Sequence, residues 1–124
     1  MNDASNSEPT DSLDPLPLVR AILLSEIWAN PGSSGYDLMK LSSELIDSYV
    51  PIQSGTVYGE LRNMQKEELV ISKQEDSGRR RREYRITERG KKTLERLYTQ
   101  IKSRVEYVLT PLLSLIQSLT QGGS

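Results

Sequence analysis

The 124-residue sequence contains no cysteine and no histidine. Disulfides, thiolate chemistry, zinc fingers and a histidine general base are therefore excluded. No apolar run approaches the ~20 residues of a membrane span, and the N-terminus lacks the basic and then hydrophobic pattern of a signal peptide. No nucleophile paired with a base, Gly-rich phosphate loop or metal constellation is visible. We expect a soluble cytoplasmic protein that is not an enzyme and needs no cofactor.

Net charge is low overall but unevenly distributed. Residues 1–50 hold two basic and eight acidic residues, a net charge of −6, whereas residues 51–110 hold fourteen basic and nine acidic residues, a net charge of +5. Because the local field decides binding, a formally neutral total does not argue against a nucleic-acid partner.

The first half of the chain predicts a polar tail and then two helices. Residues 1–14 are polar and acidic and cannot offset the entropy of ordering, so we expect a disordered tail. The segment 15–28 is apolar around most of a helical circumference, which requires cover on more than one side. Residues 30–34 (NPGSS) predict a turn, and residues 35–46 a helix with Leu38, Leu41 and Leu45 on its core edge.

The stretch 53–62, QSGTVYGELR, predicts a helix that reads DNA. Ser54 is a good N-cap residue. Helical spacing places Val57, Leu61 and Met64 on one edge for packing. The opposite side carries hydroxyls, small residues and cations, which suit a helix that enters the major groove. The alternative is an ordinary amphipathic surface helix.

After residue 68 the pattern changes to that of a β-hairpin. The segment 69–73 (LVISK) is followed by a turn at 75–78 and a second strand that ends with Tyr84 and Ile86 on one face. Four consecutive arginines, residues 79–82, fall at the tip and in the second strand. Arginine there can follow phosphates or enter a narrow minor groove, and the alternative is a solvated charge run.

The last segment predicts a long helix capped by Thr87, with a heptad seam typical of a coiled-coil-like contact between two copies of the chain. Pro111 interrupts the helix, and because the seam stays in phase across it we favour a kink over a split. The seam residues are Leu94, Tyr98, Ile101, Val105, Val108, Leu112, Leu115 and Leu119.

Three helices, a hairpin and a dimerising helix describe a winged helix-turn-helix, mainly α with a small β-hairpin. Residues 16–119 resemble the PadR family of transcriptional regulators. The resemblance is carried by Gly35-Tyr36-Asp37-Leu38, similar to G-Y-E-L; Gly55-Thr56-Val57-Tyr58 with Leu61, similar to G-T-V-Y-P-x-L; Leu69-Val70; Gly78 and Arg79; and Tyr84, Thr87 and Gly90, similar to Y-x-x-T-x-x-G.

The resemblance implies a dimeric repressor of the subgroup with a single C-terminal helix. The implied organisation is a tail (1–14), a DNA-binding domain (15–86), a dimerisation helix (87–120) and a frayed end (121–124). It also implies an operator with inverted repeats. The residues expected on DNA are Tyr36, Gln53, Ser54, Thr56, Tyr58, Gly59, Arg62, Lys66, Arg79, Arg80, Arg81 and Arg82.

Three positions depart from the family pattern. Gly59 stands where proline is usual, and we interpret it as permitting close approach of the backbone to DNA. Glu68 replaces the usual glycine before Leu-Val, so the turn into the hairpin is expected to differ. Ser34 stands where many members have histidine. An acidic Glu60 near the groove is expected to narrow the choice of operator.

Two further questions stay open at this stage. The family often binds aromatic or cationic compounds between subunits, and Trp28, Tyr98 and Tyr107 are candidates for such a pocket, although aromatics at helical spacing are more often core.

The alternative function is a winged-helix module for protein–protein interaction without DNA binding. The arginine run argues against this, because charged residues are depleted at the core of such interfaces.

Overall fold

The computed structural model describes residues 13–38, 40, 53–74 and 82–122. The chain forms two compact units, one spanning Pro17–Glu95 and the other including the described residues 13–16 and 96–122. Most of the predicted tail, the end of the second predicted helix and residues 79–81 of the arginine run lie outside the described residues.

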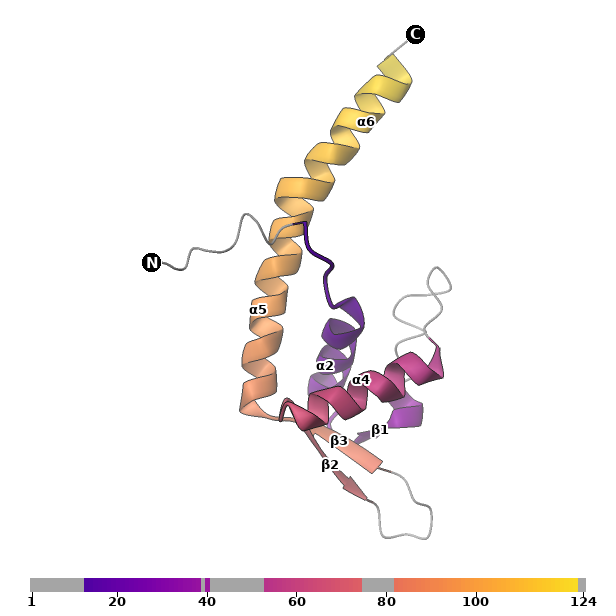
Figure 1. Cartoon of the computed structure of the whole chain (residues 1–124), viewed down its shortest axis with the longest axis vertical. Helices are drawn as coiled ribbons and strands as arrows, with labels where there is room; N and C mark the ends of the chain where they lie inside the picture. Colours follow the sequence, from indigo (N-terminus) through magenta and orange to yellow (C-terminus); the bar gives the residue numbers. More distant parts are fainter. Residues whose placement is uncertain (1–12, 39, 41–52, 75–81, 123–124) are drawn as a thin grey trace, which may run out of the picture. The chain divides into compact units, whose positions relative to one another are not determined.

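The unit Pro17–Glu95 has its core between two helices and a small sheet. Helix α2 (Leu18–Ala29) contacts both α4 (Ser54–Lys66) and strand β3 (Arg82–Ile86). In Figure 1, α4 crosses α2 beside the sheet. The buried side chains come from the predicted apolar edges and include Leu23, Leu24, Ile27, Leu38, Val57, Leu61 and Met64. The predicted core edge of α4 is thereby confirmed.

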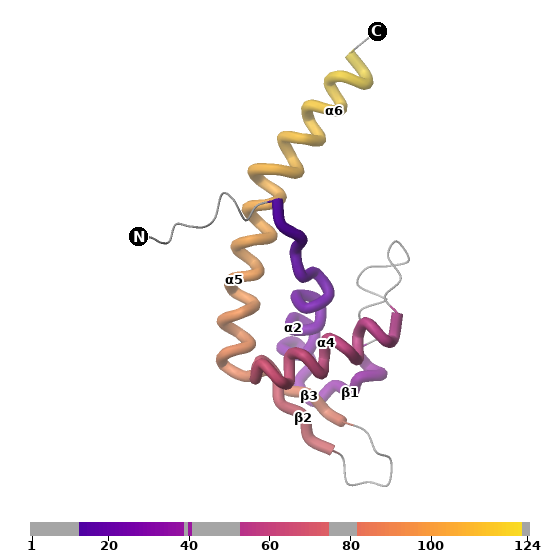
Figure 2. Tube along the Cα trace, viewed as in Figure 1, coloured from indigo at the N-terminus to yellow at the C-terminus, as the bar shows by residue number. Residues whose placement is uncertain are grey.

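The sheet has three antiparallel strands in the order β1-β3-β2, formed by β1 (Ser33–Ser34), β3 and β2 (Val70–Gln74). Figure 2 shows β2 and β3 running beside each other as the predicted hairpin. Tyr84 of β3 pairs with Ser72 on one side and with Ser33 on the other. We predicted a turn over residues 30–34, and this was wrong for its last two residues. A strand of two residues leaves no periodic pattern, and it forms because β3 offers it a free edge.

A second helix begins directly after β1. Residues 35–38 and 40 are helical. The Ser34 hydroxyl accepts a hydrogen bond from the Asp37 amide at 3.1 Å, and the Asp37 carboxylate accepts one from the Ser34 amide at 3.1 Å. This reciprocal pair satisfies two amides at the helix start, so Ser34 is the N-cap of a capping box.

The junction between α4, the hairpin and the next helix is compact. Glu68 has φ 65°, a left-handed conformation that glycine adopts more easily. The backbone therefore turns here without a glycine. The Thr87 hydroxyl donates to the backbone oxygen of Glu68 at 2.7 Å and accepts from the Gly90 amide at 3.0 Å. Thr87 therefore caps α5 (Glu88–Arg104), as predicted, while bonding to the base of β2.

Beyond α5 the chain stays helical through a π-helical segment, η2 (Val105–Leu109), into α6 (Thr110–Gly122). Pro111 lies in the first turn of α6, where its missing N–H costs least. The Thr110 amide bonds to the Val105 oxygen, five residues back. The proline is thus accommodated by a π segment on its N-terminal side, and the helix is not split there. None of the described helices combines the length and apolar character that a membrane span requires.

Candidate nucleic-acid interface

Helix α4 presents a polar side to solvent. Its first helical residue is Ser54, and Gln53 is the N-cap, with backbone in the extended region. The prediction that Ser54 caps the helix was wrong, and among the described residues no side chain bonds the cap. The exposed side chains of this region include Gln53, Ser54, Thr56, Tyr58, Arg62 and Lys66, while Gly59 is half-buried. These are the residues that we predicted on DNA.

Tyr58 is held at one edge of α4 by the neighbouring helix. A Cβ built on Gly35 would lie 2.4 Å from a ring carbon of Tyr58, so the ring lies over the glycine. The ring remains 38% exposed. Tyr36, in the first turn of the helix that begins at Gly35, is 68% exposed. Two of the predicted tyrosines are therefore brought to neighbouring helical segments, each with a free surface.

The hairpin contacts α4 through β2, and Tyr84 of β3 is buried. Burial raises the pKa of the Tyr84 hydroxyl, and the positive charges of Arg82 and Arg62 oppose this rise. The positive charges of Arg82 and Arg62 therefore act on the Tyr84 hydroxyl from β3 and from α4.

Arg82 is the one residue of the arginine run that the structure describes. It is exposed at the start of β3, and its guanidinium donates to the Ser72 hydroxyl across the hairpin at 2.9 Å. Arg85, three residues on, is also exposed. Because alternate residues of a strand face the same side, Arg82 shares its face of β3 with Tyr84, and Arg85 lies on the opposite face.

The other edge of α4 is bonded to α2. The Arg20 guanidinium donates from Nη1 to Glu67 Oε1 at 3.0 Å and from Nη2 to Glu67 Oε2 at 2.9 Å, while its Nε donates to the carboxylate of Glu60. The hydrogen bond from Arg20 lowers the pKa of Glu67. The Glu60 carboxylate accepts a hydrogen bond from Arg20 of α2, and its expected effect on operator choice stays a prediction.

Sequence reasoning did not identify Arg20 as part of this region. Its partners lie 40 and 47 residues away along the chain, so no local spacing connects them. The one available signal was a single arginine in a helix in which Ser25 and Glu26 are the other polar residues. Such a residue needs a partner when its stem is buried.

The predicted dimerisation residues lie along α5, η2 and α6. Leu94, Ile101 and Val108 are half-buried, whereas Tyr98, Val105, Leu112, Leu115 and Leu119 are exposed in the single chain. A π turn holds about one residue more than an α turn, so the residues after it are rotated by roughly a quarter turn. The heptad spacing is therefore interrupted at η2, and the role of these residues in dimerisation stays a prediction.

The three aromatic residues predicted to line a pocket differ in their surroundings. Trp28 has the Lys91 ammonium 5.0 Å from its ring centroid, a cation–π contact. Tyr98 and Tyr107 are 63% and 76% exposed. They are nine residues apart in the sequence, with Tyr98 on α5 and Tyr107 in the π-helical segment η2. Their role in ligand binding stays a prediction.

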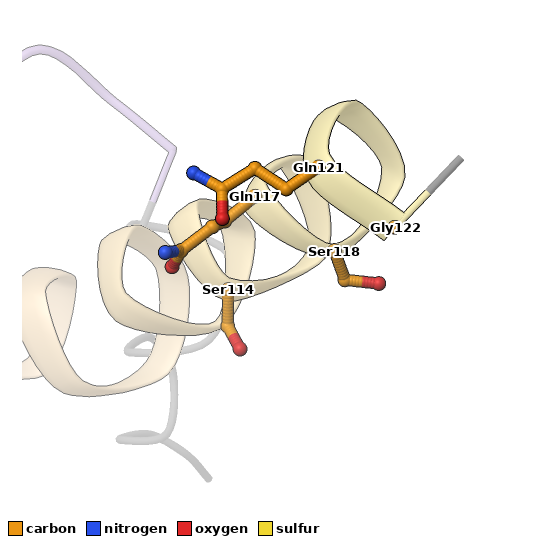
Figure 3. A pocket seen from close by; sticks show the side chains of 5 residues that line it. All are labelled: Ser114, Gln117, Ser118, Gln121 and Gly122. Atoms are coloured by element: carbon orange, nitrogen blue, oxygen red, sulfur yellow. The ribbon is translucent and has the colours of Figure 1, made fainter. Parts of the chain in front are cut away.

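A hollow along α6 is lined by polar and small residues of that helix alone. Its lining residues are Ser114, Gln117, Ser118, Gln121 and Gly122. Figure 3 shows the side chains of Gln117 and Gln121 extending to the same side of the helix. Because one helix supplies every lining residue, this is a surface groove of the polar face of α6 and differs from the apolar enclosure typical of ligand pockets.

The chain is similar to known transcriptional regulators. Residues 23–96 match the model of the Transcriptional regulator PadR-like family. A PadR-like transcriptional regulator from Bacillus cereus is 25% identical with a TM-score of 0.62, covering 81% of this chain and 92% of that one. A PadR family regulator from Eggerthella lenta is 29% identical with a TM-score of 0.63, covering 77% of this chain and 80% of that one.

A further similar fold comes from PadR of Bacillus subtilis, whose structure was solved in complex with operator DNA. It is 20% identical with a TM-score of 0.55, and the match covers 63% of this chain and 46% of that one. A comparison with functionally curated proteins finds no match.

Proposed function

Because this chain belongs to the PadR-like family of transcriptional regulators, we propose that it binds double-stranded DNA sequence-specifically as a repressor. The observation that carries this proposal is the exposed polar side of α4, with Thr56, Arg62 and Lys66, together with the exposed Arg82 at the start of β3. The operator DNA in the Bacillus subtilis PadR structure supports the same mode of action.

In this proposal α4 lies in the major groove. Arg62 and Lys66 are cations on its outward side, and arginine can donate two hydrogen bonds to guanine. Thr56 and Tyr58 add hydroxyls that can donate to phosphates or base edges. Among the described residues, the nearest atom to a Cβ built on Gly59 is Arg62 Nη2, at an ordinary contact distance of 3.7 Å. The absence of a side chain there lets the backbone come close to the DNA.

The wing supplies the second contact. We assign residues 79–82 to the phosphate backbone or minor groove, where arginine binds without reading a unique base pattern. Arg82 and Arg85 are both exposed, on opposite faces of β3. Tyr36 is assigned to the phosphate backbone next to α4. The four arginines are the feature that an interaction module for apolar protein surfaces would not need.

We further propose that the protein acts as a homodimer in the cytoplasm. The support is the row of exposed apolar side chains on α6, a helix that carries no charged residue. Leucines and isoleucines exposed in such a row mark an interaction surface. A two-fold dimer binds an inverted repeat, with half-sites about 10–10.5 base pairs apart or a multiple of this.

The DNA-binding proposal is tested with a labelled fragment from the region upstream of the protein's own gene, against a scrambled competitor and across a salt series. Saturable binding that resists the competitor is expected. Replacing residues 79–82 with alanine should reduce the salt slope, because each lost phosphate contact removes about one counterion. Absence of binding at low salt would instead favour the protein-interaction module.

A matched pair of variants tests the role of α4. Arg62→Ala should reduce binding to the selected fragment more than binding to the scrambled one, since a base contact contributes about 1–3 kcal/mol of discrimination. Lys92→Ala removes the same charge from an exposed position on α5 and should change neither. Equal losses in both variants would contradict a reading role for Arg62.

The dimer is tested by sedimentation velocity on two α6 variants. Leu113→Gln with Ile116→Gln replaces exposed apolar side chains and should weaken dimerisation. Ser114→Gln with Ser118→Gln makes comparable changes on the polar face and should leave the dimer intact. A monomeric wild-type protein at micromolar concentration, or a single half-site bound as tightly as the full operator, would contradict the proposal.

A small aromatic effector between subunits stays a prediction for Trp28, Tyr98 and Tyr107. Trp28 is the only tryptophan of the chain, so its fluorescence reports on this region alone. Titration with phenolic acids and aromatic cations should quench or shift its emission if the pocket exists. An unchanged spectrum across the panel would count against a pocket at Trp28.

A further inference from the structure

Arg20 bonds to two carboxylates of α4 with three of its nitrogen atoms. The Glu67 carboxylate accepts hydrogen bonds from Nη1 at 3.0 Å and from Nη2 at 2.9 Å, and the Glu60 carboxylate accepts one from Nε. The planar guanidinium is suited to this, because its donors point in fixed directions. We call Arg20, Glu60 and Glu67 the Arg20 cluster.

The two glutamates lie on one edge of α4. They are seven residues apart, close to two full turns, so their side chains leave the helix in nearly the same direction. Arg20 therefore ties the middle and the C-terminal end of α4 to the same point on α2. Contacts at two positions along α4 resist both rotation of the helix about its axis and tilting of that axis.

Tyr58 restrains the opposite edge of the same helix. Its ring lies against Gly35, at a separation that leaves no room for a Cβ. The core edge with Val57 and Leu61 lies between these two restraints. The rotation of α4 about its own axis decides which side chains face outward, because neighbouring positions differ by about 100°.

The Arg20 cluster also offsets one of the two negative charges that Glu60 and Glu67 bring to α4. The hydrogen bond from Arg20 lowers the pKa of Glu67, and the pKa of Arg20 is raised chiefly by the hydrogen bond to Glu67. Both shifts indicate that the charged forms favour each other. An unpaired carboxylate at either position would repel phosphate.

We propose that Arg20 is a positioning residue for DNA recognition, which sets the orientation of α4 by holding Glu60 and Glu67 and does not itself touch DNA. This inference rests on the proposed function. It differs from a direct phosphate contact, in which Arg20 would act without its glutamate partners.

The experiment compares Arg20→Met, Glu67→Gln and the double variant. Each is measured for affinity to the selected DNA fragment, affinity to the scrambled fragment and the salt slope on the scrambled fragment. Unfolding in urea reports stability. Lys102→Met is the matched control, because it removes a positive charge from α5 and breaks an exposed ion pair with Glu106 of η2 at 3.8 Å.

Arg20→Met is expected to lower affinity for the selected fragment about tenfold. The salt slope on scrambled DNA should stay unchanged, since no phosphate contact is lost. The double variant should lose no more than Arg20→Met alone, because both changes disrupt one interaction. Arg20→Lys, which cannot make the two-pronged bond, should fall between wild type and Arg20→Met.

Two results would overturn the proposal. The first is a salt slope that falls by about one in Arg20→Met, both when Glu67 is present and in the double variant. This would show that Arg20 makes a phosphate contact. The second is a loss of stability while the ratio of the affinities for the selected and the scrambled fragment stays unchanged. This would show that Arg20 has only a structural role.

Amide hydrogen exchange of the free protein separates this inference from the proposed function. Arg20→Met should speed exchange of the α4 amides more than that of the α2 amides, whether or not DNA binds. If the wild type binds no DNA but this difference appears, the proposed function fails while the positioning of α4 stands. Equal exchange in wild type and variant would overturn the positioning itself.

Discussion

Gly35 and the ring of Tyr58 are in direct contact, since a Cβ built on Gly35 would lie 2.4 Å from one ring carbon and 3.2 Å from another. The contact joins the first turn of one helix to the second turn of α4. It determines where an exposed tyrosine of the candidate interface points. A glycine distant in sequence thereby acts on the surface that we assign to DNA.

Gly35→Ala should displace the Tyr58 ring and weaken operator binding by about tenfold, roughly 1.4 kcal/mol. The ring is partly exposed, so it can move outward and stability should change little. Competition binding and urea unfolding measure the two effects. In a Tyr58→Ala background the second substitution should have no further effect on affinity, and additive losses would show that Gly35 acts by another route.

Gly59→Ala should raise the stability of the protein while it lowers the affinity for operator DNA. A built Cβ meets only Arg62 Nη2, at an ordinary 3.7 Å, so alanine fits the free protein and should stabilise the helix by up to about 1 kcal/mol. If the backbone of α4 approaches DNA at this point, operator affinity should fall at the same time. Thermal unfolding and competition binding give the two values, and equal or tighter binding would contradict the close approach.

Gly90→Ala should destabilise the protein by about 1–3 kcal/mol or more. A Cβ at this position would lie 2.1 Å from the backbone oxygen of Leu69, and a backbone atom cannot move aside as a flexible side chain can. This outweighs the better helix propensity of alanine. Gly122→Ala is the control, because nothing lies within 4 Å of its built Cβ; urea unfolding should find it neutral.

Glu68→Gly should stabilise the protein by about 1 kcal/mol, because Glu68 adopts φ 65° and only glycine does so without steric cost. Glu88→Gly is the comparison, since Glu88 lies in the first turn of α5 and loses helix propensity and an ion pair with Lys91 at 3.4 Å. Unfolding midpoints should move in opposite directions. A destabilised Glu68→Gly would show that the side chain makes a contribution larger than the strain.

Stability should fall above pH 10 partly through Tyr84. Burial raises the pKa of its hydroxyl from the ordinary value of 10.0. Between that value and the raised one, the unfolded chain has released the proton while the folded protein still holds it, so rising pH favours unfolding. Below pH 10 this contribution is complete. Tyr84→Phe should flatten the stability profile between pH 9 and 11 in urea unfolding, and an unchanged slope would contradict it.

Much of the fold follows from short-range pattern. The helical period places Val57, Leu61 and Met64 on one edge of α4, and all three are buried. Alternation in β3 places Tyr84 inward and Arg85 outward, and Thr87 caps α5 as its residue type suggests. These features depend on neighbours within a few residues, where backbone geometry alone decides which side chains share a face.

The tertiary structure alone decided the features that join distant segments. Strand β1 exists because β3 pairs with it, the π segment η2 precedes Pro111 in place of a simple kink, and Glu60 accepts a hydrogen bond from Arg20. The sequence by itself determined which residue types each element carries and where the helices and hairpin lie. Partners separated by 40 residues or more leave no periodic signal, because only packing of the elements brings their side chains within bonding distance.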